Sequence, residues 1–312
     1  MAGFHSDRLM ELLSRSDEPF LKLMETLVND TRFPSYWHGI GFQYLGPLLV
    51  LFSRWLKKST DDLGIRRIFF LARDGEVMKR VYTALYPDEA SKCRYLLCSR
   101  RLCANETCRE DFISYLRSEG LDKAGSAIVD VGRNGTMQKA LESFFPDNAL
   151  HGFYIDLRAS GWNLHGYFDH TPPNGRRVLD FLDFLCISPS LLTVAVRRRN
   201  SGFKIETLEE DENEHARHLI AVDLQDGAES FARAYRRSGM EPKDPPQETT
   251  IEILNLLKHP TKGDFAAMAN VTAPFGVTNN KERYLVTPLW PWRERLRHPI
   301  AFLSAWRKRI FR

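Results

Sequence analysis

The sequence predicts an α/β protein whose sheet is mainly parallel and Rossmann-like, flanked by helices and extended by helical additions at both ends. Short apolar runs alternate with segments of helical spacing, and two of the runs lead through a loop with an acid and a glycine into a helix. A chain of 312 residues with 43% hydrophobic content can bury a substantial interior. Open parallel sheets bind ligands at the carboxyl ends of their strands, so the two loops predict one shared site.

The patterns divide the chain into four parts: a helical section at 1–62, an α/β core at 63–205, a helical remainder at 206–280 and a basic, aromatic tail at 281–312. Apolar residues recur at helical spacing in 8–28 and again in 36–58, which predicts the N-terminal helices. Further helices are predicted over 211–236 and 250–258, on either side of a proline-rich stretch.

Strands of the core are predicted at 66–72, 94–99, 126–131 and 151–157. Each is a short run of apolar and β-branched or aromatic residues, and helical segments lie between several of them. Residues 159–177, which are rich in Gly, Asn and Pro, are predicted to form a loop.

The first strand-loop-helix unit spans 67–80 and reads RIFFLARDGEVMKR. Arg73, Asp74 and Gly75 form its loop, and apolar residues at helical spacing follow. An aspartate directly before a helix can cap the helix by accepting backbone N–H bonds, and it can also face a ligand. Asp74 is therefore predicted to do both.

The second unit begins with the apolar run at 127–129. Its loop starts at Asp130 and continues with the residues predicted to bind phosphate, which are Gly132, Arg133, Asn134, Gly135 and Thr136. Backbone N–H groups, the positive end of a helix dipole and a hydroxyl group together suit a phosphate. Gln138, one turn into the following helix, could reach the same ligand or simply face solvent.

Ser99, Arg100 and Arg101 end the second predicted strand and should face the same edge of the sheet. With Arg73 and Arg133 they bring four guanidinium groups, which suit bidentate contacts to a diphosphate. Each arginine alone could equally be an ordinary surface residue. Their presence in three loops at one edge favours binding.

This layout is similar to that of phosphoribosyltransferases, in which a first loop holds pyrophosphate and a second, acid-containing loop holds ribose 5-phosphate. The resemblance implies a phosphoribosyltransferase-like fold in which Asp130 accepts hydrogen bonds from sugar hydroxyls while the loop after it cradles phosphate. Those enzymes usually carry two adjacent acids and Thr-Gly-x-Thr, whereas Val131 follows Asp130 here.

A second resemblance extends over roughly residues 36 to 270. It rests on the order GFQYLGPLLVLFSRWL, IFFLARDGEVMKRVYTAL, YLLCSRRL, IVDVGRNGTMQKAL, HGFYIDL and HPTKGDFAAM. This order resembles the C-terminal region of the predicted hydrolases of the haloacid dehalogenase superfamily in bacterial surface-polysaccharide gene clusters. An Asp-x-Asp phosphatase domain normally precedes that region, and the chain contains no D-x-D-x-[TV] motif. The family also commonly has Trp where this chain has Arg133. The resemblance implies a setting in cell-envelope glycan assembly.

These observations leave three hypotheses. The first is a transferase that binds a phosphorylated or nucleotide-activated sugar, with Asp74 and Asp130 as catalytic residues and electrostatic positioning as the main contribution. The second is a noncatalytic binding or scaffold subunit of a polysaccharide assembly complex, and the third is a phosphatase-type hydrolase. We predict no metal site in the chain itself; the cofactor stays open, with Mg²⁺ the ion that a diphosphate substrate would bring.

The tail carries nine Lys or Arg against two Glu, a net charge of +7, so the other residues sum to −3 of the formal +4. Aromatic residues, among them Trp290, Trp292 and Trp306, alternate with these basic residues. This pattern is expected for a segment at an anionic membrane surface, while packing of the tryptophans on the core is the alternative. We expect no specific nucleic-acid binding.

No signal-peptide pattern opens the sequence, which predicts a cytoplasmic location with membrane association through the tail. The most apolar run, 39–52, is too short to span a bilayer and is expected to be a core helix. Cys93, Cys98, Cys103 and Cys108 recur every five residues, a step that turns successive side chains apart, so buried free thiols are expected.

Overall fold

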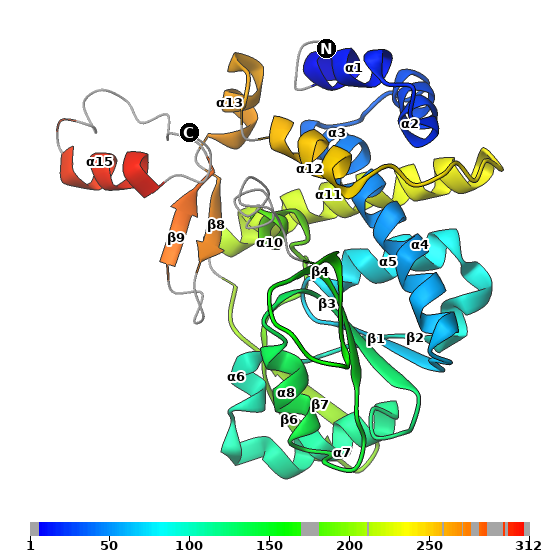
Figure 1. Ribbon diagram of the computed structural model, residues 1–312. Coiled ribbons are helices and arrows are strands. Elements are labelled where there is room, and N and C mark those ends of the chain that lie inside the picture. The colour runs from blue at the N-terminus through cyan, green and yellow to red at the C-terminus, as the bar shows by residue number, and fades with distance from the viewer. Residues whose placement is uncertain are drawn as a thin grey trace.

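The computed structural model describes residues 6–169, 181–210, 212–257, 259–269, 271–275, 281–285, 296 and 299–308. At its centre lies a five-stranded parallel sheet flanked by helices, as Figure 1 shows. In chain order its strands are β1 (Arg67–Leu71), β2 (Cys93–Leu96), β3 (Ser126–Arg133), β4 (His151–Leu157) and β5 (Leu164–Asp169). The predicted fold class, an α/β sheet with helical additions, is confirmed.

The spatial order of the strands is β2-β1-β3-β4-β5. From β1 the chain moves outward to β2, and then returns to the other side of β1 with β3. The order therefore reverses between β1 and β3, whose registers pair Arg67 with Ser126 and Phe70 with Val129. In open parallel sheets such a reversal opens a crevice at the carboxyl ends of the two strands, where ligands bind.

Both faces of the sheet are buried, which explains why its strands read as nearly continuous apolar runs. In β1, Ile68 and Phe70 belong to one hydrophobic cluster, while Phe69 and Leu71 belong to a second cluster on the opposite face. The alternation follows from the two-residue period of a strand.

The hydrophobic cluster on the first face continues into helices from both the N-terminal and later parts of the chain, and not all of these helices lie against the sheet (Figure 1). They are α1 (Ser6–Arg15), α2 (Pro19–Asn29), α3 (Tyr36–Ile40), the π-helix η1 (Gly41–Leu45), α4 (Gly46–Asp62), α5 (Gly75–Leu85), α10 (Leu182–Leu185), α11 (Glu212–Arg237), α12 (Gln247–Leu256) and α13 (Lys262–Met268). The 3₁₀ helix η2 (Pro87–Lys92) joins α5 to β2.

The second face is covered by shorter helices and an antiparallel hairpin. These elements are α6 (Arg100–Cys103), the 3₁₀ helix η3 (Glu106–Cys108), α7 (Arg109–Glu119), α8 (Thr136–Glu142), β6 (Thr193–Arg199) and β7 (Gly202–Thr207). Away from the sheet, β8 (Thr272–Phe275) pairs with β9 (Lys281–Tyr284), and α15 (Pro299–Lys308) lies beside them (Figure 1).

Helix α11 crosses the continuous α3–η1–α4 segment at unusually close range. A methyl group on Gly41 would overlap the backbone oxygen of Leu224, and one on Gly227 would overlap the backbone oxygen of His38. Glycine at these positions lets the two backbones touch. In Figure 1 the long α11 runs between the sheet and the terminal helices α1, α2 and α12, so it joins the two parts of the molecule.

Several elements differ from the sequence predictions. The predicted loop at 159–177 contains β5, and the second strand ends at Leu96 instead of reaching residue 99. β5 contains a glycine and a histidine and is a strand because it pairs with β4. A local sequence pattern does not show such a pairing. The single periodic segment at 8–28 forms two helices, α1 and α2.

Other predictions agree with the structure or concern residues outside its described part. The helix predicted at 211–236 is α11, and the one at 250–258 begins earlier, as α12. The hairpin β8–β9 crosses the boundary predicted at residue 280. Much of the tail at 281–312 lies outside the described residues. Among the helices that are described, none combines the length and apolarity that crossing a bilayer requires.

We expect Gly227→Ala to lower the free energy of unfolding by about 2 kcal/mol, because the added methyl group forces α11 away from α3. Gly39→Ala in α3 is the matched control, since its methyl group would lie 3.4 Å from the Phe33 ring and meet no backbone. Urea denaturation of both variants measures the difference. Equal stability of the two variants would contradict the close crossing.

Candidate functional site

Asp74 lies three residues after the end of β1, and Asp130 lies inside β3. The loop predicted to start at Asp130 therefore starts only after Arg133, where β3 ends. β1 and β3 are the strands between which the order reverses. The chain leaves β1 through a cis peptide bond between Ala72 and Arg73. Asp74 occupies the N-cap position of α5, but its side chain makes no capping hydrogen bond. The predicted capping role is therefore wrong.

A third acid, Asp183, comes to the same place from α10 and was not predicted from the sequence. The pKa of Asp74 is raised well above its ordinary value by burial, then by the negative charges of Asp183 and Asp130. The pKa of the buried Cys186 thiol is raised by burial and by the same three carboxylates. Three acids from segments far apart in the chain therefore share one electrostatic environment.

The pKa of Asp130 is raised to about 6. Burial is the largest cause and the charge of Asp183 adds to it, while the Val131 N–H and the positive charges of Arg100 and Arg133 act in the opposite direction. A carboxyl group that titrates near pH 6 can take up or release a proton close to neutral pH.

Two neighbouring elements hold α10 in position. Ser188 and Ser190, just after this helix, donate hydrogen bonds from their hydroxyl groups to the Glu76 carboxylate of α5, the second at 3.1 Å. From α11, the Gln225 amide donates to the backbone oxygen of Ile187 at 3.0 Å. The location of Asp183 thus depends on both α5 and α11.

The four predicted arginines are not equivalent. Arg100 is exposed, its guanidinium group forms no hydrogen bond or ion pair with a described residue, and its charge lowers the pKa of both Asp74 and Asp130. Arg101, also exposed, is not among the charges that act on these acids. Arg100 therefore offers the guanidinium group best placed for an anionic ligand.

The other two arginines already pair with acids. Arg73 Nη1 lies 2.6 Å from Glu214 Oε1 of α11, and both side chains are about 15% exposed. Arg133 Nη2 lies 2.9 Å from Asp183 Oδ2. These pairs fix the loops to α11 and α10, and a ligand would have to compete with the carboxylates for the guanidinium groups.

Ser99 and Gln138 use their polar groups within the protein. The Ser99 hydroxyl accepts from Leu102 N at 3.0 Å and donates to Thr193 O at 2.8 Å. The fully buried Gln138 amide donates to Leu150 O at 2.8 Å and accepts from the Tyr154 hydroxyl. The predicted binding role of Gln138 is corrected to a structural one, and Ser99 serves as the N-cap of α6.

The glycines of the two loops are required by packing. A methyl group on Gly75 would lie 2.7 Å from the Phe70 carbonyl carbon, so α5 could not start so close to β1. Gly132 has a φ of +112°, and its methyl group would lie 2.7 Å from Asp156 O. Gly135, also at positive φ, is the N-cap residue of α8, and Asn134 and Thr136 beside it are exposed.

Asp156 and Arg158 are a further charged pair that the sequence analysis missed. Asp156 ends β4 next to Gly132, is fully buried, and has Oδ2 2.7 Å from Arg158 Nη2. The signal was an acid at the end of the strongly apolar segment HGFYIDL. Burying an unpaired carboxylate costs free energy, and Arg158 supplies the opposite charge for Asp156.

The donor groups do not fit a resident metal ion. Within the described part of the chain, no three His, Cys, Asp or Glu side chains come together as metal ligands would. The charge that balances the acids is arginine.

All five cysteines are free, and four of them are buried. The expectation that successive cysteines point apart fails at one step, because Cys98 Sγ and Cys103 Sγ lie 3.7 Å apart. Between them the chain turns from the end of β2 into the single turn of α6, so neither strand nor helix geometry applies along the whole interval.

Comparison with known proteins adds no family to this geometry. No family model matches the chain, and no match was found among curated proteins. The site must therefore be interpreted from its own residues.

We expect Asp130→Asn to raise the free energy of unfolding at pH 7.5 by about 1 to 3 kcal/mol, because it removes a carboxylate whose ionisation the fold opposes. The carboxyl group titrates near 3.8 when unfolded and near 6 when folded, so wild-type protein recovers this stability as the pH falls through that window. The difference in free energy of unfolding between Asp130→Asn and wild type should shrink by more than half at pH 4.5. Asp147→Asn, at an exposed position, is the control. An equal stability difference between Asp130→Asn and wild type at both pH values would argue against the raised pKa.

Proposed function

We propose that this protein is a transferase that binds a phosphorylated or nucleotide-activated sugar in the crevice between β1 and β3. The observation that carries the proposal is the meeting of Asp74 and Asp130, both with raised pKa, at the point where the strand order reverses. Acids with strongly perturbed pKa values are frequent at functional sites.

The chemistry follows from the charges. Arg100 supplies a guanidinium group for phosphate oxygens, and the exposed loop residues Asn134 and Thr136 lie at the other side of the crevice, after β3. Asp130, with a pKa of about 6, can accept a proton from a sugar hydroxyl near neutral pH. Burial and the neighbouring carboxylates raise the pKa of Asp74, which suits it to donate a hydrogen bond to a leaving oxygen.

Assembly of bacterial surface polysaccharides is the setting we propose, on the strength of the sequence resemblance. Mg²⁺ would enter with a diphosphate substrate, since the described acids do not form a metal site of their own. The proposed roles of Arg100, Asp130 and Asp74 do not require this ion.

A noncatalytic binding or scaffold role is the second candidate, and a specific observation favours it. Arg73, Arg133, Ser99 and Gln138, four of the residues predicted to bind substrate, already have protein partners. A site in which internal pairs replace ligand contacts could retain the fold without turnover.

Asp74→Asn and Asp130→Asn should each abolish turnover while both variants stay folded. Arg100→Gln should weaken binding of sugar nucleotides or phosphoribosyl pyrophosphate at least tenfold, because a charge-assisted contact to phosphate is lost. Arg236→Gln, an exposed arginine at the far end of α11, is the control. Calorimetry and a thermal-shift panel with and without Mg²⁺ measure binding. Wild-type turnover in both Asp variants would reject the transferase, and no response to any phosphate ligand would favour the scaffold.

We also propose that the basic tail contacts an anionic membrane surface. Ile300 and Leu303 of α15 are 82% and 50% exposed, and their spacing of three residues places them on one face of this helix. The tail's net charge of +7 adds electrostatic attraction to anionic lipids.

Replacing Ile300 and Leu303 together by Asp should lower sedimentation with phosphatidylserine vesicles at least fivefold, since the apolar face is lost and two negative charges are added. Leu219→Asp, at another exposed apolar position, is the control. Unchanged binding of the double variant would show that the tail does not hold the membrane.

A further inference from the structure

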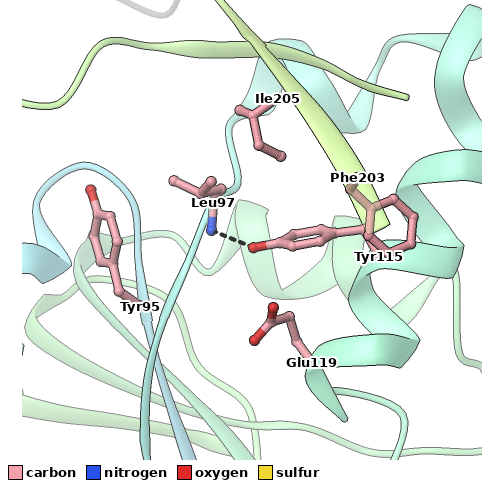
Figure 2. Close-up of a pocket in the computed structure, with 6 residues that line it drawn as sticks. All are labelled: Tyr95, Leu97, Tyr115, Glu119, Phe203 and Ile205. Atoms are coloured by element: carbon pink, nitrogen blue, oxygen red, sulfur yellow. Dashed lines mark hydrogen bonds between the residues drawn. The ribbon is translucent and has the colours of Figure 1, made fainter. Parts of the chain in front are cut away.

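A pocket lined by none of the acids described above lies beyond the edge strand β2. Its volume is about 400 Å³, and it is lined by Tyr95, Leu97, Tyr115, Glu119, Phe203 and Ile205 (Figure 2). These residues come from the β2 segment, from α7 and from the hairpin strand β7. Three independent elements thus build the walls.

Two of the walls are aromatic rings set nearly at right angles. The Tyr115 and Phe203 centroids are 5.7 Å apart, with an interplanar angle of 76°. The Tyr115 hydroxyl accepts a hydrogen bond from Leu97 N at 3.1 Å, shown dashed in Figure 2, which fixes the ring. Rings arranged in this way present negative π-faces that attract organic cations. The cation–ring contacts of the described residues use other rings.

Glu119 gives the pocket a formal negative charge. It is the last residue of α7, where the helix dipole is negative and favours a cation instead of a carboxylate. Arg67 and Lys123 approach the helix end at Gly120, yet within the described ranges neither comes within ion-pair distance of the Glu119 carboxylate. Burial raises the pKa of Tyr115, and the Glu119 charge adds to this, so the carboxylate lies near enough to act on the Tyr115 hydroxyl group.

We propose that this pocket binds a small organic cation, an ammonium or guanidinium group carried on an apolar or aromatic body. The cation would face Glu119 and the rings of Tyr115 and Phe203, while Leu97 and Ile205 would contact the apolar body. The volume falls within the range of small-molecule sites, which fits a free amine better than a folded partner.

The pocket also adjoins the acidic crevice along the chain. Leu97, which the Tyr115 hydroxyl holds, lies three residues before Arg100. A ligand in the pocket would therefore contact the same short backbone segment that carries the Arg100 guanidinium group. The proposal does not depend on the transferase, because the two sites use different residues.

Binding of phenethylammonium to the full-length protein, followed by calorimetry and by NMR shifts of the Phe203 ring, tests the proposal. The neutral analogue 2-phenylethanol, with the same carbon skeleton, should bind at least tenfold more weakly. Glu119→Gln should reduce the preference for the amine about tenfold, and Phe203→Leu should weaken the amine more than the alcohol. Glu110→Gln, an exposed acid on the same helix, should change neither.

An acetylated arginine amide tests whether the same chemistry can be supplied by a peptide side chain; tighter binding than phenethylammonium would identify a protein partner as the source of the cation. Equal affinity for amine and alcohol, no effect of Glu119→Gln, or no binding of either cation at millimolar concentration would each overturn the proposal. None of these results alters the expected behaviour of the Asp74 and Asp130 variants.

Discussion

The close crossing of α11 over the α3–η1–α4 segment is the contact on which the rest of the structure depends. Glycines on both sides remove the side chains that would separate the backbones. Once seated, α11 supplies Glu214 to Arg73 and Gln225 to the segment after α10. It also pairs its Glu229 with Arg80 of α5 at 2.7 Å. The loops at the carboxyl edge of the sheet are thus positioned by a helix outside the α/β core.

The crevice itself opposes folding stability. Burying acids close together raises the free energy of their ionised forms, and Arg100, Arg133 and the Val131 N–H offset only part of this cost for Asp130. The hydrophobic clusters on both faces of the sheet must supply the difference. Such a cost is consistent with a site retained for its chemistry, since an apolar residue would stabilise the fold more.

The sequence predicted the parts of the fold that local patterns encode. β1, β3 and β4 appeared as apolar runs, and Asp74 and Asp130 followed from the strand-loop-helix pattern. β5 escaped prediction because its order comes from pairing with β4. The site was predicted only in part, because local sequence does not show which partner a side chain will find. From the sequence Gln138 was predicted to bind a ligand, but in the structure its amide forms hydrogen bonds with Leu150 and Tyr154. Asp183 reaches the site only through tertiary contacts.

The pair of Arg73 and Glu214 has a consequence for the synthesis of the protein. The two residues are 141 positions apart, so β1 and its loop leave the ribosome long before their partner exists. Until α11 has emerged, the nascent chain carries an exposed glycine-lined helix surface and an arginine without its carboxylate. Domains generally fold from the N-terminus as they are made, but the loop after β1 lacks this carboxylate until α11 has been made. The ion pair therefore forms only after synthesis has passed residue 214, and a truncated product lacking α11 would carry the sheet residues without this contact.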